Sequence, residues 1–230
     1  MRKLKTIDIK AVIVDNDTGQ FYQYFGMEAV TPKGVNTILH DINSKEPVTV
    51  NIASPGGDVD AASEIYTMLR QHEGEVHVIV QGTAASSASV IAMAGDQISM
   101  SPTAKMMIHR ASTVISGNTN DAKHLANVLS TVDQSIMAAY QDRTGLPATD
   151  IIKMMEEETW LTAQTAVDKG FADEIMFVDD KQTQYVNSTL PLPSKAAVNK
   201  LLNLINQQNK QFKPSQPTLL QRKLTILEGE

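Results

Sequence analysis

The chain has no cysteine among its 230 residues. This absence excludes disulfide bonds, thiolate zinc sites and a cysteine nucleophile. Long hydrophobic runs are also missing, since no segment approaches the ~20 apolar residues of a membrane span. The basic start is followed only by the short apolar run 11–14, which is too short for the core of a signal peptide. We therefore expect no membrane association and a location in the cytoplasm.

Excess positive charge is missing as well, because the formal net charge is −6. A net negative chain has little attraction for polyanions, so we expect no nucleic-acid partner. The length suits one large domain with an extension. Composition changes after Asp180, which predicts a domain over 1–180 and an extension over 181–230. That extension reads as a linker, a short amphipathic helix over 194–208 and a polar tail.

Strand-like and helix-like segments alternate along the first 180 residues, which predicts an α/β fold. Apolar patterns predict strands over 11–14, 48–52, 76–80, 106–108 and 174–178. Helical spacing predicts helices over 35–42, 61–71, 87–94, 120–143, 151–157 and 163–169. The segment Asp15-Asn-Asp-Thr-Gly19 is predicted to be a turn.

A glycine pair, Ser54-Pro-Gly-Gly57, follows the predicted strand 48–52. One interpretation is a strand-to-helix turn in which glycine permits positive φ. The other is an oxyanion hole, because a backbone without Cβ can bring an N–H against a substrate carbonyl. A serine-rich segment one strand later favours the second interpretation.

That segment is Gly82-Thr-Ala-Ala-Ser86-Ser87, placed where a strand meets a helix. A helix N-terminus favours developing negative charge, so the nucleophile is Ser86 or Ser87, and Ser89 is assigned to packing. No Gly-x-Ser-x-Gly elbow is present, which disfavours an α/β-hydrolase.

His109 is the preferred general base because it closes the predicted strand 106–108. A base that projects from one strand end toward a neighbouring strand end has the geometry that a catalytic triad needs. The other histidines are assigned to surface, packing or interface positions: His40, His72, His77 and His124.

Three segments together resemble the Clp protease proteolytic subunit family. They are Asn51-Ile-Ala-Ser-Pro-Gly-Gly57, with one residue inserted, Gly82-Thr-Ala-Ala-Ser86 and Lys105-Met-Met-Ile-His109. Ala94-Gly95 lies at the family's offset beyond the serine, which sets the register on Ser86. The similarity covers about residues 10–178.

The resemblance implies a role for five residues. Ser86 would be the nucleophile and His109 the general base, and the backbone N–H groups of Gly57 and Ser87 would form the oxyanion hole. The family's third triad member is an Asp just before an aromatic-Leu-(Ser/Thr)-Ala segment, here Trp160-Leu-Thr-Ala163. The matching position holds Glu158, and Glu157 is the alternative.

The resemblance also implies a ClpP/crotonase-type α/β fold of stacked βαβ units, here with a helical C-terminal extension. It implies acyl-enzyme chemistry and homo-oligomeric rings. No cofactor or metal is expected, since the sequence has neither a Walker loop nor a metal-ligand cluster.

Two departures from the housekeeping subunits point to a subtype. The segment before Val48 lacks the family's N-terminal signature, and the tail after Asp180 is long. Both features resemble the Clp-like proteases of phage head-assembly modules, which implies scaffold and capsid proteins as substrates in the host cytoplasm. The alternatives are a housekeeping subunit with an AAA+ unfoldase partner, a relative of the signal-peptide peptidases, and a shell or scaffold protein without catalysis.

Overall fold

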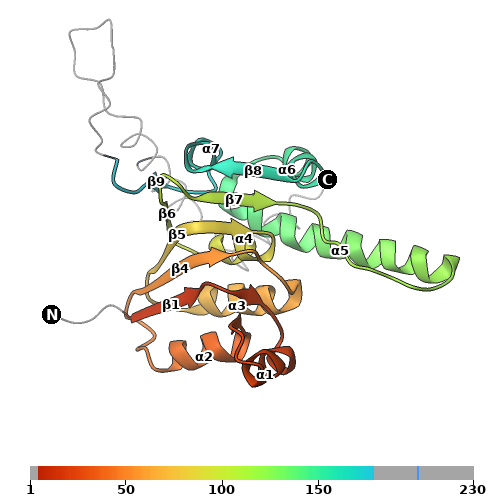
Figure 1. Cartoon of the computed structure of the whole chain (residues 1–230). Helices are drawn as coiled ribbons and strands as arrows, with labels where there is room; N and C mark the ends of the chain where they lie inside the picture. Colours follow the sequence, from red (N-terminus) through yellow and green to blue (C-terminus); the bar gives the residue numbers. More distant parts are fainter. Residues whose placement is uncertain (1–4, 179–200, 202–230) are drawn as a thin grey trace, which may run out of the picture. The chain divides into compact units, whose positions relative to one another are not determined.

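Strands and helices alternate in a computed structural model of the chain, which describes residues 5–178 and Leu201 (Figure 1). The chain divides into two units, Met1–Val178 and Asp179–Glu230, and the elements named here belong to the first. The strands are β1 (Lys5–Ile9), β2 (Val12–Ile13), β3 (Ala29–Val30), β4 (Val48–Ser54), β5 (Val76–Ala85), β6 (Gln97–Met100), β7 (Lys105–Ile108), β8 (Thr159–Thr162) and β9 (Glu174–Ile175). The helices are α1 (Asn16–Tyr24), α2 (Pro32–His40), α3 (Val59–Gln71), α4 (Ser87–Ala92), α5 (Thr119–Thr144), α6 (Ala148–Glu156) and α7 (Ala163–Asp168).

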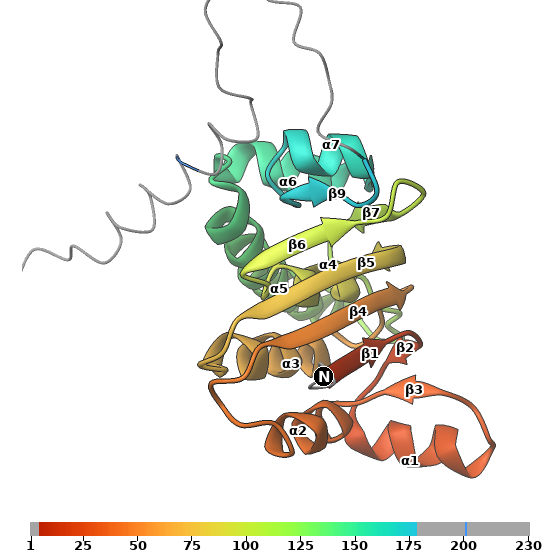
Figure 2. The ribbon, with the colours of Figure 1, turned by 90° about the vertical axis from the view of Figure 1, so that its left-hand side faces the viewer.

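A seven-stranded sheet forms the centre of the first unit, in the order β1-β4-β5-β6-β9 (Figure 2). β7 pairs with β5, and β8 pairs with β7. Only the β7–β8 pair is antiparallel among the described pairs of this sheet. Parallel neighbours joined through helices are βαβ units, so the predicted α/β class is confirmed. The predicted linker, C-terminal helix and tail fall, Leu201 aside, outside the described residues.

The core lies between the sheet and the helices α3 and α4. Side chains along β4 alternate between buried and half-buried, as the sequence pattern predicts for a strand with one covered face. Helix α3 turns Ile65 and Leu69 inward, and all six residues of α4 are buried. Each fully buried aliphatic side chain contributes about 1.5–3 kcal/mol to the free energy of unfolding. The strand ends that flank α4 are therefore held on a rigid base.

β5 changes its neighbour midway, and this arrangement positions the site. Its residues His77–Val80 pair with β6, whereas Thr83–Ala85 pair with β7. β6 therefore lies beside the first part of β5, and β7 lies beside its last part. As a result the ends of β5 and β7 lie side by side.

The elements near the start differ from the sequence prediction, which did not include β1, α1 or β3. β1 pairs with β4 along Lys5–Ile9, a stretch that we read only as a basic start, and the strand predicted over 11–14 shrinks to β2. The predicted turn at Asp15 is instead the N-terminus of α1, because the Asp15 carboxylate accepts hydrogen bonds from the N–H groups of Asp17 and Thr18. Asp and Asn favour turns and helix N-caps for the same reason, which is that their side chains bind free backbone N–H groups.

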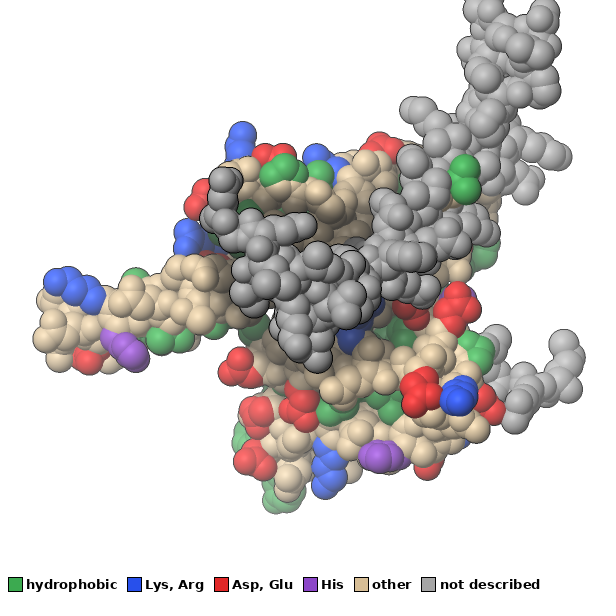
Figure 3. All heavy atoms as spheres, turned by 180° about the vertical axis from the view of Figure 1, so that it is seen from behind, with side chains coloured by type: hydrophobic (Ala, Val, Ile, Leu, Met, Phe, Trp, Pro, Cys, Tyr) green, Lys and Arg blue, Asp and Glu red, His purple; other side chains and the backbone are tan. Residues whose placement is uncertain are grey.

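Helix α5 is only half packed. A capping box at Asn118 starts the helix and Gly145, in the left-handed conformation, ends it. Its buried residues all lie in the second half, from Asp133 onward. The first half stands clear of the rest of the unit (Figures 1 and 3). We call residues 119–131 the α5 arm.

Candidate active site

Ser86 and His109 meet where β5 and β7 end. Parallel pairing sets Ala85 beside Met107, so Ser86 and His109 follow their strands at nearly the same level. The Ser86 N–H donates to the Met107 carbonyl at 2.9 Å, which fixes the two strand ends together. The Oγ of Ser86 and the Nε2 of His109 are 2.7 Å apart, a hydrogen-bond distance. Both residues are partly exposed, so a substrate can reach them.

The backbone of Ser86 is strained. Its φ of 55° and ψ of −130° lie in a region that residues with a side chain rarely adopt. Strain of this kind costs about 1–3 kcal/mol and persists where surrounding contacts hold it, often at functional sites. Here the turn changes a strand directly into α4 and presents the serine hydroxyl at the junction.

The two glycines of the Ser54-Pro-Gly-Gly57 turn meet different neighbours, Gly56 this junction and Gly57 the backbone of Ile13. A Cβ at Gly56 would lie 2.5 Å from the Ala85 carbonyl oxygen and 2.8 Å from the Ser86 Cβ. A Cβ at Gly57 would lie 2.1 Å from the Ile13 carbonyl oxygen. Both also have positive φ, 92° and 148°. Close approach therefore requires glycine at both positions.

The two proposed oxyanion-hole donors are near this contact. Ile13 donates to the Gly56 carbonyl and accepts from the N–H of Asp58, which leaves the N–H of Gly57 directed away from Ile13. Ser87 is the first residue of α4, where helix geometry provides no internal partner for the N–H. The Ser87 nitrogen would be 3.0 Å from a Cβ placed on Gly56, so the glycine turn and the start of α4 are in contact.

The residues alone left the nucleophile as either Ser86 or Ser87, and the hydrogen bonding of the two hydroxyls can now be compared. The imidazole of His109 is bonded to Ser86, whereas the Oγ of Ser87 is buried without a hydrogen-bond partner in the described residues. Two other histidines bond elsewhere: His72 to the Glu46 carbonyl at 2.7 Å and His77 to Glu75 at 3.2 Å.

Glu158 lies beside His109 without a bond to it. The antiparallel register pairs Ile108 with Thr159, so the next residues along are His109 and Glu158. The Glu158 carboxylate, however, accepts from the Trp160 indole N–H at 3.4 Å. In the described part of the chain, His109 has no hydrogen bond or ion pair with Glu158 or Glu157. The structure thus brings Ser86 and His109 together and leaves the third group apart.

Sequence reasoning missed two supporting hydroxyls. Ser54 is buried, and its Oγ donates to the Ala11 carbonyl and accepts from the Gly56 N–H, which shapes the glycine turn. Ser89, assigned to packing, donates from Oγ to the Ser86 carbonyl at 2.6 Å. The only sequence signal was that both serines lie next to the functional motifs, which does not separate a supporting hydroxyl from a small packing residue.

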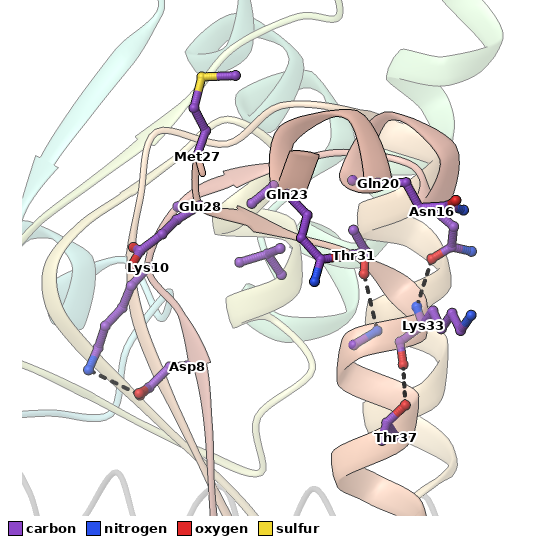
Figure 4. A pocket seen from close by; sticks show the side chains of 15 residues that line it. Asp8, Lys10, Asn16, Gln20, Gln23, Met27, Glu28, Thr31, Lys33 and Thr37 are labelled. Atoms are coloured by element: carbon purple, nitrogen blue, oxygen red, sulfur yellow. Dashed lines mark hydrogen bonds and ion pairs between the residues drawn. The ribbon is translucent and has the colours of Figure 1, made fainter. Parts of the chain in front are cut away.

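A separate pocket of about 720 Å³ lies between β1, α1 and α2 (Figure 4). Lys10 and Asp8 form an ion pair at 3.1 Å on one side of it, and Asn16 accepts from the Lys33 N–H on the other. Neither Ser86 nor His109 lines this pocket. The described residues contain no cluster of His, Asp and Glu suited to a metal ion, and no helix there is long and apolar enough to cross a membrane.

Comparison with known proteins places these motifs in context. The Clp protease family model matches residues 34–179. The chain is 32% identical over 178 residues to the ATP-dependent Clp protease proteolytic subunit 1 of Chlamydia caviae, covering 73% of this chain and 93% of that one. It is 32% identical over 141 residues to the ATP-dependent Clp protease proteolytic subunit 2 of Thermobifida fusca, covering 60% and 70%. Ser86, His109 and Glu158 all lie inside the matched range.

Proposed function

The chain belongs to the Clp protease family and is a serine-type peptidase, and from this premise we propose that Ser86 and His109 carry out its catalysis. The observation that supports this assignment is the 2.7 Å contact between the Ser86 Oγ and the His109 Nε2, made at a strained strand-to-helix turn. The proposal covers peptide-bond hydrolysis through an acyl-enzyme.

In the first step, Ser86 attacks the carbonyl carbon of the scissile peptide bond. With the imidazole proton on Nδ1, Nε2 of His109 accepts the Oγ proton as the bond to carbon forms. The carbonyl oxygen becomes an oxyanion, and the N–H groups of Gly57 and Ser87 donate to it. Such donors contribute about 3–4 kcal/mol to transition-state stabilisation.

The imidazolium then passes its proton to the leaving amine, the C–N bond breaks and the acyl-enzyme remains. Water attacks the ester with His109 again as base, which releases the acid and restores the Ser86 hydroxyl. We assign Glu158 to the orientation of the imidazole through its Nδ1 proton. This role requires the carboxylate to turn from Trp160 toward His109.

A fluorophosphonate probe tests the nucleophile, because it forms a covalent bond with an activated serine. Ser86→Ala should abolish labelling with little loss of stability, since the change removes one partly exposed hydroxyl. Ser87→Ala is the matched control and should retain labelling. Labelling that survives in Ser86→Ala and disappears in Ser87→Ala would move the nucleophile by one residue. A wild-type chain that never labels would favour the non-catalytic shell protein.

For the substrate, we infer loosely folded scaffold and capsid proteins of a phage, cleaved without ATP in the host cytoplasm. Residues 1–33 lie outside the family match, and β2, α1 and β3 occupy Val12–Val30 within them. The sequence of this part lacks the N-terminal signature with which the family's housekeeping members meet an unfoldase, and this departure supports the proposal. The polar tail after residue 180 adds a second difference.

The similarity to subunits of ATP-dependent Clp proteases favours a second candidate, a housekeeping subunit that works with an ATPase. Co-expression with phage capsid and scaffold proteins separates the two. Processing by the wild type but not by Ser86→Ala supports maturation, and identical unprocessed products reject it. Cleavage of a folded, tagged substrate only with an AAA+ unfoldase and ATP would support the housekeeping candidate.

A further inference from the structure

The second half of α5, which contacts α4 and α6, carries two polar residues on its buried face. Its buried residues are Asp133, Ile136, Ala139 and Tyr140. Residues seven apart in a helix lie nearly above one another, so Asp133 and Tyr140 share one face with Ile136 between them. Charged and polar side chains are seldom fully buried unless specific partners hold them.

Asp133 binds the segment that directly follows His109. Its side chain is 3% exposed, and one oxygen accepts from Arg110 Nε at 2.7 Å. Its other oxygen accepts from the N–H of Ala111, also at 2.7 Å. Arg110 is further bonded through its own N–H to the Met155 carbonyl of α6. The two residues after the proposed base are therefore tied to α5 by both carboxylate oxygens.

Tyr140 reaches the proposed nucleophile through one hydroxyl. The Oγ of Ser89 is 2.8 Å from the Tyr140 hydroxyl and donates its own proton to the Ser86 carbonyl at 2.6 Å. Since that proton is already used, Tyr140 is the donor in the contact between the two hydroxyls. Burial raises the pKa of Tyr140, which keeps the phenol protonated as this role requires. A chain of two hydrogen bonds thus connects α5 to the strained backbone of Ser86.

Packing alone does not require the carboxylate of Asp133 or the hydroxyl of Tyr140. Ile136 and Ala139 already fill the same face with apolar side chains, and the Tyr140 ring packs on Phe171 with its centroid 5.7 Å away whether or not a hydroxyl is present. A buried carboxylate carries a desolvation cost that an apolar residue of similar size would avoid. Both sets of contacts lead to the Ser86–His109 pair. The one from Tyr140 reaches the Ser86 carbonyl through Ser89, and those from Asp133 hold the two residues that follow His109.

We propose that Asp133 and Tyr140 are positioning residues for catalysis, through which α5 holds the nucleophile and the base at their hydrogen-bond distance. The inference rests on the proposed roles of Ser86 and His109. Asp133 acts through Arg110 and Ala111 on His109, and Tyr140 acts through Ser89 on Ser86. Neither touches the substrate. Their effect is on the rate of the chemical step, since misplacement of about 1 Å at a reacting pair costs up to ~100-fold.

The test measures the acylation of full-length protein by a fluorophosphonate over a range of probe concentrations. This separates the maximal rate kinact from the half-saturating concentration KI. Tyr140→Phe removes one hydroxyl and keeps the ring, and Asp133→Asn replaces an acceptor with an amide that cannot accept both bonds. Arg110→Lys keeps the charge of a half-exposed side chain but loses the Nε–H. Ile136→Val is the control, because it loosens the same face without changing a polar contact.

At a temperature where all variants are folded, we expect kinact to fall about fivefold in Tyr140→Phe and roughly ten- to hundredfold in Asp133→Asn. KI should stay unchanged, and Ile136→Val should keep the wild-type kinact despite a lower Tm. Should Asp133→Asn not fold, Tyr140→Phe and Arg110→Lys still decide the matter. An unchanged kinact in both variants would overturn this inference and leave the proposed function intact. The same holds if kinact falls in proportion to Tm in every variant, Ile136→Val included. A wild-type chain that is not labelled at Ser86 overturns the proposed function and this inference with it.

Discussion

Glu158, which directly precedes β8 and which the register sets beside His109, accepts a hydrogen bond from the indole N–H of Trp160 at 3.4 Å. Glu158 also has a positive φ of 47°, uncommon for a residue with a side chain. A glutamate is one methylene longer than the aspartate that the family resemblance implies, so it has more rotamers to choose between. The orientation of this one side chain decides whether His109 has a charged partner.

Glu158→Gln should lower turnover of a peptide substrate by roughly two to four orders of magnitude, because the amide cannot stabilise the imidazolium. The same change at the neighbouring exposed position, Glu157→Gln, is the control and should have little effect. Trp160→Phe removes the competing indole N–H and should leave turnover equal or higher. Full activity in Glu158→Gln would assign the role to another group or to none.

Gly56 gives a second prediction at this scale. In Gly56→Ala the new methyl would lie 2.5 Å from the Ala85 carbonyl oxygen, so the turn and Ser86 must move apart. We expect a loss of at least about 2 kcal/mol in the free energy of unfolding by urea, together with weak probe labelling. Gly26→Ala is the control, since it shares a positive φ of 68° but meets no atom within 4 Å. Equal losses in the two variants would show that backbone conformation alone, and not the contact with Ser86, requires glycine.

Among the elements, α1 depends most visibly on one side chain. Asp15 accepts from the N–H groups of Asp17 and Thr18 and from the Thr18 hydroxyl. These hydrogen bonds, with that of the Thr18 hydroxyl the largest, lower the pKa of Asp15 below its ordinary 3.8. A lowered pKa in the folded state means that the ionised cap stabilises α1 above about pH 3.8. The contribution disappears as the pH falls through the lower, folded-state value.

Asp15→Asn should make α1 less sensitive to acid, because an amide can still cap the helix but does not titrate. The measurement is amide hydrogen exchange in α1 between pH 5 and pH 2.5, corrected for the intrinsic exchange rate. The wild type should lose protection below about pH 3.8, and the variant should show a flatter profile. Asp17→Asn, in the first turn but not the cap, is the control. Parallel profiles for the wild type and Asp15→Asn would contradict the capping role.

For the whole molecule, the α5 arm carries apolar residues that the described part of the chain does not cover. Leu125 and Leu129 are only half buried, and Val128 is 43% exposed. Space-filling spheres show the arm with hydrophobic and charged side chains side by side (Figure 3). A helix face of this kind is expected to be buried against another copy. We propose that the copies assemble into one homo-oligomeric ring or two stacked rings, in line with the rings that the family resemblance implies.

Val128→Asp should therefore weaken the assembly while the fold stays stable to within about 0.5 kcal/mol, because the residue lies outside the core. Sedimentation velocity at micromolar concentration should show a ring-sized species for the wild type and smaller species for the variant. Asn127→Asp adds the same charge at a neighbouring exposed position and should assemble normally. A wild-type chain that sediments as a fully active monomer would refute the ring.

Local patterns in the sequence were enough for the α/β class, the helices α2 to α7 to within a few residues, and the candidates His109 and either Ser86 or Ser87. The family resemblance, and not the local pattern, selected Ser86. The spacing of apolar residues and the position of turn-forming residues are properties of short segments, so they can be recognised without knowing the fold. Five elements were not predicted. Three are the short strands β3, β6 and β8, and the others are β1, whose residues resemble a basic terminus, and α1, whose first turn uses residues that also form turns. The predicted membership of the Clp protease family is confirmed by the family match.

Only the tertiary structure decided how those elements meet. The split of β5 between β6 and β7 sets Ser86 beside His109, and no local pattern encodes such a register between distant strands. The same is true of Asp133 and Tyr140, which are bonded to the segments around the site because the second half of α5 packs there. The side chain of Glu158 went to Trp160 because a rotamer is chosen by all its neighbours at once. Sequence determined the chemistry available to this protein, and packing determined which of those groups are within bonding distance.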